Sequence, residues 1–136
     1  MSAPTPVVRA VTYERDGHRC VSCGASSRLE YQHRAVEGQG GRKARPQLDE
    51  GVTTCAMCNP LYEGSLQSKA LLMGWKVRTW VRDQGIAYRV PVFFAVERNW
   101  FLLDREGRRF PIGRARARAL MVEVYGPEYE KWEATA

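Results

Sequence analysis

Four cysteines in this chain of 136 residues are spaced so that they can bind one metal ion. They form two Cys-x-x-Cys pairs, Cys20/Cys23 and Cys55/Cys58. Each pair fits a tight turn that directs two sulfurs at one point, and two such turns complete the tetrahedral thiolate shell that suits Zn²⁺. Four sulfurs leave no open coordination position, so the sequence predicts a structural zinc. The alternatives are disulfides or isolated buried thiols, and a redox role for one pair would need a thioredoxin-like context that is missing here.

His33 is one of only two histidines, and it lies between the cysteine pairs in the stretch LEYQHRAVEGQGG, residues 29–41. A neutral imidazole is a good general base at pH 7, because its ordinary pKa is about 6.5. The residues before it predict a strand, and those after it form a Gly-rich basic loop in which backbone can approach DNA closely. We therefore expect His33 to serve as an acid–base group in a reaction. His18, in the approach to the first cysteine pair, is expected to be solvated or to support that turn.

Together with the cysteines, three stretches resemble the HNH endonucleases, and most closely the small zinc-knuckle type of phages and actinobacteria. They are RDGHRCVSCG at the first pair, YQHRAVEGQGG between the pairs and GVTTCAMCN at the second pair. The resemblance covers about residues 7–74. It implies a ββα-metal core, in which a β-hairpin and a helix hold one catalytic divalent ion beside the zinc. It also implies hydrolysis of DNA phosphodiester bonds, with His33 in the position of the general base.

The resemblance further implies a site for the catalytic ion, which would be Mg²⁺ or alternatively Mn²⁺ or Ni²⁺. Its ligands would be Gln32, where the family often has Asp, His or Glu, and Asn59, a known substitution for histidine. Glu50 stands where the family usually has an asparagine that orients the base, and a carboxylate can hold an imidazole in the same way. Glu63 lies one helical turn after Asn59 and is a candidate for the carboxylate ligand that Gln32 does not supply.

Because two of these ligands are neutral, the sequence leaves two classes of function open. The first is a metal-dependent DNA endonuclease. The second is a zinc-stabilised protein with weak or no catalysis, which acts as a DNA-binding module, an adaptor or an inhibitor of another phage or host protein. Taken one at a time, Gln32, Glu50 and Glu63 are equally consistent with ordinary polar surface residues.

The charge of the chain favours an anionic partner. Its formal net charge is +6 and its pI is about 9.4, a balance typical of proteins that bind nucleic acid. We expect double-stranded DNA to contact a basic group around His33 that consists of Arg34, Arg42, Lys43 and Arg45. A second basic group either follows the DNA backbone further out or forms a solvated helix face; it comprises Arg108, Arg109, Arg114, Arg116 and Arg118.

Two units of an α+β fold are expected to position these residues. Residues 1–74 would form the zinc-stapled HNH unit, with a helix or an extended segment at 7–17, a strand at 28–33 and a helix at 65–73. Residues 75–136 contain no Cys or His and would form a β-rich appendage with a closing helix. Its strands are predicted in WKVRTWV, IAYRVPVFFAV and NWFLLD, followed by helices at 114–125 and around 128–132.

The chain has no stretch that is long and apolar enough to span a membrane. Its N-terminal segment, MSAPTPVVRAV, lacks the apolar region of a secretory signal. We therefore expect a cytoplasmic protein, located in the host cytoplasm if a phage encodes it, where cysteines stay reduced.

Overall fold

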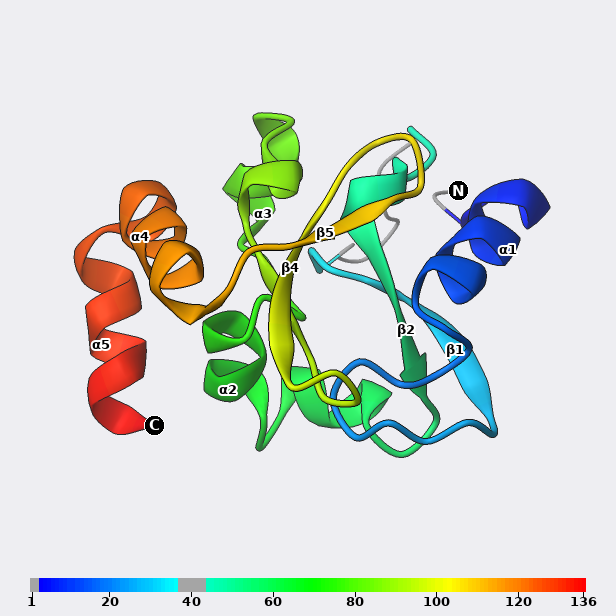
Figure 1. Ribbon diagram of the computed structural model, residues 1–136, viewed down its shortest axis with the longest axis horizontal. Helices are drawn as coiled ribbons and strands as arrows, with labels where there is room; N and C mark the ends of the chain where they lie inside the picture. Colours follow the sequence, from blue (N-terminus) through cyan, green and yellow to red (C-terminus); the bar gives the residue numbers. More distant parts are fainter. Residues whose placement is uncertain (1–2, 37–43) are drawn as a thin grey trace.

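The computed structural model describes residues 3–36 and 44–136, which combine helices and strands as predicted (Figure 1). The first part of the chain contains α1 (Pro6–Arg15), β1 (Leu29–His33), the 3₁₀ helix η1 (Leu48–Glu50), β2 (Gly51–Cys55), the 3₁₀ helix η2 (Asn59–Glu63) and α2 (Gln67–Leu72). The second part contains α3 (Thr79–Asp83), the 3₁₀ helix η3 (Ala87–Arg89), β3 (Val92–Phe94), β4 (Asn99–Leu103), β5 (Arg109–Pro111), α4 (Arg114–Tyr125) and α5 (Pro127–Thr135).

Strands β1 and β2 form an antiparallel hairpin that sets the spacing between the cysteines and the histidine. Leu29 pairs with Cys55 at one end, and His33 pairs with Gly51 at the other. A side chain at Gly51 would displace the Tyr31 ring, because a Cβ atom there would lie 2.1 Å from Cζ of that ring. The cysteine end and the histidine end of the hairpin are therefore separated by the full length of the strands.

Helix α1 is joined to β2 by a buried ion pair. Arg15 and Asp16 are both buried, and Arg15 Nε donates to Asp16 Oδ1 at 2.7 Å. Asp16 Oδ2 also accepts a hydrogen bond from Thr53 N at 2.8 Å, and Arg15 donates to the carbonyl of Gly51 at 2.8 Å. The pair thus satisfies backbone groups of β2 that face away from β1. The helical alternative for residues 7–17 is the one that the chain adopts.

The second part of the chain holds a three-stranded antiparallel sheet in the order β3-β4-β5, which confirms the strand predicted in NWFLLD. The prediction of a strand in WKVRTWV is wrong, because α3 begins within it at Thr79. Its fully buried valines, Val77 and Val81, are four residues apart, a spacing that fits one face of a helix as well as one face of a strand. In IAYRVPVFFAV only Val92–Phe94 is strand, and Ala87–Arg89 is a 3₁₀ helix.

Helices α4 and α5 close the chain as predicted. Gly126, with φ +59, separates them, and Pro127 opens the second helix. They are held together by aromatic side chains, among them Tyr125 and Trp132, whose ring centroids lie 4.8 Å apart. None of the helices in the described ranges has the length and apolar character that a membrane span requires.

One hydrophobic core crosses the boundary predicted near Gly74. Gly74 has φ +75, and a Cβ atom there would lie 1.7 Å from Pro91 O, so only glycine allows the segments to pack this closely. The buried cluster draws on both sides of this position; its members are Cys20, Val21, Val52, Cys55, Cys58, Tyr62, Ala70, Trp75, Val92, Phe94, Phe101 and Leu103. The two predicted units are therefore continuous in space.

Candidate metal centre

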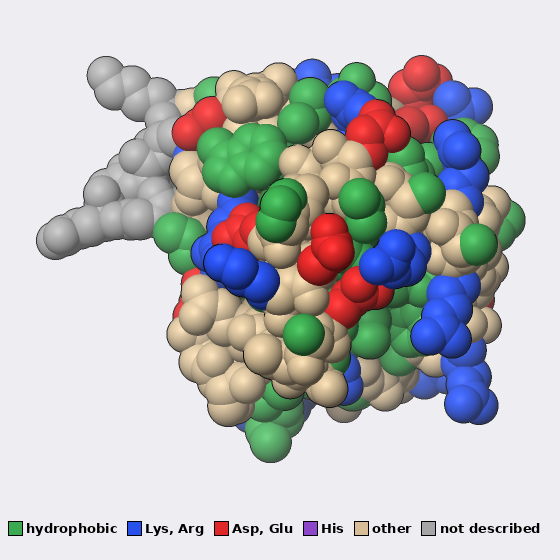
Figure 2. Space-filling view, turned by 90° about the vertical axis from the view of Figure 1, so that its left-hand side faces the viewer, with side chains coloured by type: hydrophobic (Ala, Val, Ile, Leu, Met, Phe, Trp, Pro, Cys, Tyr) green, Lys and Arg blue, Asp and Glu red, His purple; other side chains and the backbone are tan. Residues whose placement is uncertain are grey.

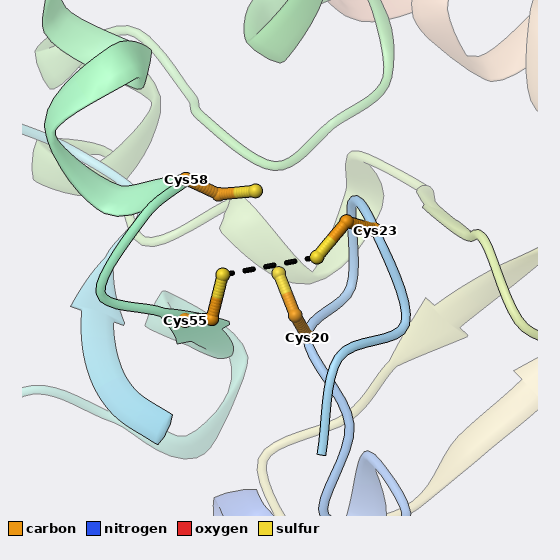
Figure 3. Close-up of side chains that lie close together, drawn as sticks. All are labelled: Cys20, Cys23, Cys55 and Cys58. Atoms are coloured by element: carbon orange, nitrogen blue, oxygen red, sulfur yellow. Dashed lines mark hydrogen bonds between the residues drawn. The ribbon is translucent and has the colours of Figure 1, made fainter. Parts of the chain in front are cut away.

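The two cysteine pairs meet in space. Cys20 and Cys23 lie between α1 and β1, Cys55 ends β2, and Cys58 precedes η2. All four sulfurs lie within 4.8 Å of one another, and the side chains converge on one point (Figure 3). A tetrahedral site with Zn–S bonds of about 2.3 Å has sulfurs about 3.8 Å apart, and Cys23 Sγ lies 3.7 Å from Cys55 Sγ. All four cysteines are free of disulfides, so the cluster can hold a structural metal ion such as zinc.

Hydrogen bonds and an aromatic stack hold the cluster in shape. Gly24, with φ +78, donates its N–H to Cys20 O at 2.9 Å and closes the first turn. The Ser22 hydroxyl lies 3.3 Å from Cys20 Sγ and 2.5 Å from the hydroxyl of the buried Tyr62. The Tyr62 ring stacks on Trp75 with centroids 5.8 Å apart. The C-terminal part of the chain therefore supports the metal centre.

The thiols differ in how readily they ionise. Burial acts to raise the pKa of Cys20, but hydrogen bonds from the Ser22 side chain, from backbone N–H groups and from Thr54 outweigh it and lower this pKa to about 6. Burial raises the pKa of Cys58 to about 12 and also raises the pKa of Cys23. Of Cys20, Cys23 and Cys58, Cys20 is thus the residue whose thiolate form the surroundings favour.

His33, the predicted base, lies at the end of β1 with a half-buried side chain. Its ring packs edge-on against Tyr31, with centroids 5.2 Å apart. The preceding residue, Gln32, donates from Nε2 to the carbonyl of His33 at 2.9 Å. Successive residues of a strand face opposite sides, so Gln32 and His33 lie on opposite faces of the hairpin. The predicted base and the first predicted ion ligand are neighbours in the chain but do not converge on one point.

Asn59 lies against a carboxylate that the sequence reasoning missed. Its Nδ2 donates to Glu30 Oε1 at 2.7 Å. Glu30 lies two residues before Gln32 on β1, so the two share one face of the hairpin. All three side chains are half-buried, and together they form an oxygen-rich face, which we call the Glu30 face. Side chains alternate between the two faces of a strand, so the predicted strand in LEYQH already places Glu30 on the same face as Gln32.

The two other predicted carboxylates are engaged elsewhere. Glu50 is buried, and its Oε1 accepts a hydrogen bond from Gln47 N at 3.0 Å. Glu63 forms an ion pair with Lys76, so Glu30 takes the place beside Asn59 that Glu63 was expected to take. Within the ranges that the structure describes, the four cysteines are the sole group of three or more His, Cys, Asp or Glu close enough to hold an ion.

Arg34 is not a DNA-contact residue, and that prediction is wrong. Its side chain is fully buried, and its guanidinium donates five hydrogen bonds to backbone carbonyls at 2.8–3.1 Å. These carbonyls belong to four residues in three separate segments, namely Asp49, Gly74, and the pair Ala87 and Val90 at the two ends of η3. Burial lowers the pKa of Arg34 to about 10, which still leaves it charged at neutral pH. Arg34, which follows His33 in the sequence, thus stabilises the fold by linking its loops.

The other members of the basic group predicted around His33 are Arg42, Lys43 and Arg45. Arg45 is exposed and donates to Ala3 O at 2.8 Å. Arg42 and Lys43 lie outside the described residues. In the second basic group, the guanidinium carbon of Arg109 lies 4.5 and 4.4 Å from the ring centroids of Phe94 and Phe101, so this arginine packs on the sheet.

No protein-family model, curated protein or solved structure matches this chain. Its function has to be inferred from the residues and their geometry. The features that bear on function are the four-cysteine cluster at one end of the hairpin, His33 at the other end, and the Glu30 face between them.

Proposed function

We propose that this protein is a metal-dependent endonuclease of the HNH type that hydrolyses phosphodiester bonds of double-stranded DNA. The observation that carries the proposal is the hairpin, whose cysteine end belongs to a four-cysteine cluster and whose opposite end carries His33. The order of β1, β2, η2 and α2 is compatible with a ββα-metal core. In this proposal the zinc is structural, and the chemistry takes place at the hairpin.

His33 is assigned the role of general base. Hydrolysis of a phosphodiester requires that a water molecule be deprotonated as it attacks phosphorus. The half-buried His33 side chain remains accessible to a substrate, and the Tyr31 ring against it restricts its orientation. The resemblance implies that Glu50 orients the imidazole; its side chain is buried, with Oε1 accepting from Gln47 N and Oε2 4.0 Å from Arg105 Nη2.

The Glu30 face is assigned the catalytic ion, Mg²⁺ or alternatively Mn²⁺ or Ni²⁺. Glu30 supplies a carboxylate, and Gln32 and Asn59 supply amide oxygens, which are the hard donors that such ions prefer. When bound, the ion polarises the phosphate and neutralises charge on the leaving oxygen.

Replacing Glu30 by glutamine is expected to weaken Mn²⁺ binding about tenfold or more, because it removes the only charged ligand of the Glu30 face. The measurement is calorimetric titration of Mn²⁺ into zinc-loaded protein. Glu63→Gln is the matched control, since Glu63 is committed to Lys76 and its loss should leave Mn²⁺ affinity unchanged. If the two variants behave alike, the assignment of the ion to Glu30 is refuted.

Supercoiled plasmid provides the test of the proposed activity. Zinc-loaded protein is incubated with plasmid and Mg²⁺, Mn²⁺ or Ni²⁺, and conversion to the open-circular and linear forms is followed on a gel. We expect nicking that needs one of these ions and stops when it is omitted. Absence of nicking with all three ions would contradict the proposal.

A second candidate function is favoured by the contacts of the ion ligands. Gln32 and His33 lie on opposite faces of β1, and Glu30 Oε1 already accepts from Asn59 Nδ2, so the proposed ion ligands and the base do not converge. This arrangement suits a zinc-stabilised DNA-binding or adaptor protein that does not cleave, or an inhibitor of a phage or host protein. Retarded migration of a DNA duplex without nicking would favour the DNA-binding alternative, and no DNA binding at low salt would favour the inhibitor.

A further inference from the structure

A groove of about 590 Å³ lies between α2 and elements of the C-terminal part of the chain, and its lining includes no residue of β1 or β2. Its walls come from the end of α2, the β3–β4 hairpin and the helices α4 and α5. Figure 1 shows α4 and α5 on the side of the molecule opposite α1 and β1. Its lining comprises Leu72, Met73, Phe93, Arg98, Asn99, Trp100, Arg114, Arg118, Tyr129, Glu133 and Ala136. Neither His33 nor the Glu30 face takes part in it.

The lining side chains of this groove carry an excess of positive charge. They include three arginines and one glutamate, a net of two positive charges. Arg118 is paired with Glu133, with Nη2 2.8 Å from Oε1. Arg98 and Arg114 are exposed, and Arg114 also interacts electrostatically with Glu133. Figure 2 looks onto the α4–α5 side and shows Lys and Arg side chains gathered along its right-hand edge.

The inner surface of the groove is aromatic and apolar. Phe93 and Trp100 are cross-strand neighbours on β3 and β4, half-buried, with their rings edge to face and centroids 5.5 Å apart. Tyr129 on α5 and the α2 residues Leu72 and Met73 complete this surface. Aromatic faces bordered by exposed arginines are the combination with which proteins bind single-stranded nucleic acid, because bases stack on the rings while cations contact the phosphates.

We propose that this groove binds an unpaired segment of DNA, with a base against Trp100 and Phe93 and phosphates at Arg98 and Arg114. A base must leave its duplex to reach these rings, so a single strand is preferred over a duplex. This function goes beyond the proposed cleavage and does not depend on it. The residues that would hold the single strand lie outside the hairpin that carries His33.

The test is fluorescence anisotropy of a labelled oligodeoxythymidine titrated with zinc-loaded protein that carries His33→Ala, so that cleavage cannot interfere. In this background, Arg98→Asn, which suits the φ of +55 at this position, and Arg114→Ala are each expected to weaken binding about threefold to tenfold and to lower the salt-dependence slope by about 0.7. Trp100→Leu is expected to weaken binding about tenfold through lost stacking. The matched control is Arg116→Ala, an exposed residue of α4 that does not line the groove and should leave affinity unchanged.

Equal affinity for the Arg98, Arg114 and Arg116 variants would overturn the proposal, and these exposed positions keep the test valid even if the Trp100 variant misfolds. A duplex of the same length that competes as well as the single strand would overturn it too. The outcome is separable from cleavage. If the unchanged protein nicks plasmid but oligonucleotide binding does not depend on Arg98 and Arg114, only the groove proposal is refuted. If binding depends on these arginines and the unchanged protein does not nick plasmid, the groove proposal is supported and the nuclease proposal is refuted.

Discussion

Replacing His33 by alanine is expected to slow the metal-dependent nicking of plasmid DNA by about 100-fold or more, because general-base catalysis contributes about 10²–10⁴-fold to enzymatic rates. The change should leave the fold intact. His33 is half-buried at the end of β1, and its described ring contact is with Tyr31. The rate is measured from the loss of supercoiled plasmid over time, with protein in excess of DNA.

The other histidine provides the control. His18 is exposed, lies outside the hairpin and has φ +54, a conformation that asparagine tolerates better than alanine. His18→Asn should therefore nick at the wild-type rate. Nicking by His33→Ala at the same rate as His18→Asn would mean that the general base is a different group, and the assignment of the chemistry to the hairpin would fail.

Arg34→Met is expected to lower the free energy of unfolding by about 3–5 kcal/mol, because it leaves buried backbone carbonyls without donors. Methionine retains an apolar stem but none of the five hydrogen bonds that the guanidinium makes. The measurement is the midpoint of urea unfolding, followed by circular dichroism on zinc-loaded protein.

Arg45→Met is the matched control for this prediction. Arg45 is exposed and makes one described side-chain hydrogen bond, to Ala3 O, so its replacement should change stability by no more than about 0.5 kcal/mol. Equal unfolding midpoints for the Arg34 and Arg45 variants would show that the buried guanidinium does not stabilise the fold. Because Arg34 is buried, any loss of DNA binding in its variant should follow the loss of folded protein.

The parts of the site that could be predicted from sequence were those fixed by local spacing. Two residues between paired cysteines are enough to form each turn, and the alternation in LEYQH is enough to make a strand. Each of these features is decided within a few residues, so Cys20, Cys23, Cys55 and Cys58 meet as expected. The same holds for α4, because the sequence predicted both its length and its end at Gly126.

The parts that could not be predicted depend on contacts between distant residues. The residues around Arg34 in the sequence do not distinguish it from an arginine that binds DNA. In the structure its guanidinium donates to carbonyls of residues that are 15 to 56 positions away. Glu30 became a candidate ligand only because η2 brings Asn59 against β1. The α3 segment has valines at a spacing common to both helix and strand, and its helical state depends on packing against the C-terminal helices, as the contact between Trp80 and Tyr125 illustrates.

Native mass spectrometry of the purified chain tests the metal centre most directly, and the hairpin on which the proposed chemistry depends is built around that centre. The expected result is one zinc ion per folded chain, released on acid unfolding and absent from the Cys55→Ser/Cys58→Ser double variant. Met57→Ser is the control from the same turn; its side chain is exposed, and it should keep the zinc. A metal-free folded chain, or full zinc occupancy in the double variant, would contradict the structural zinc.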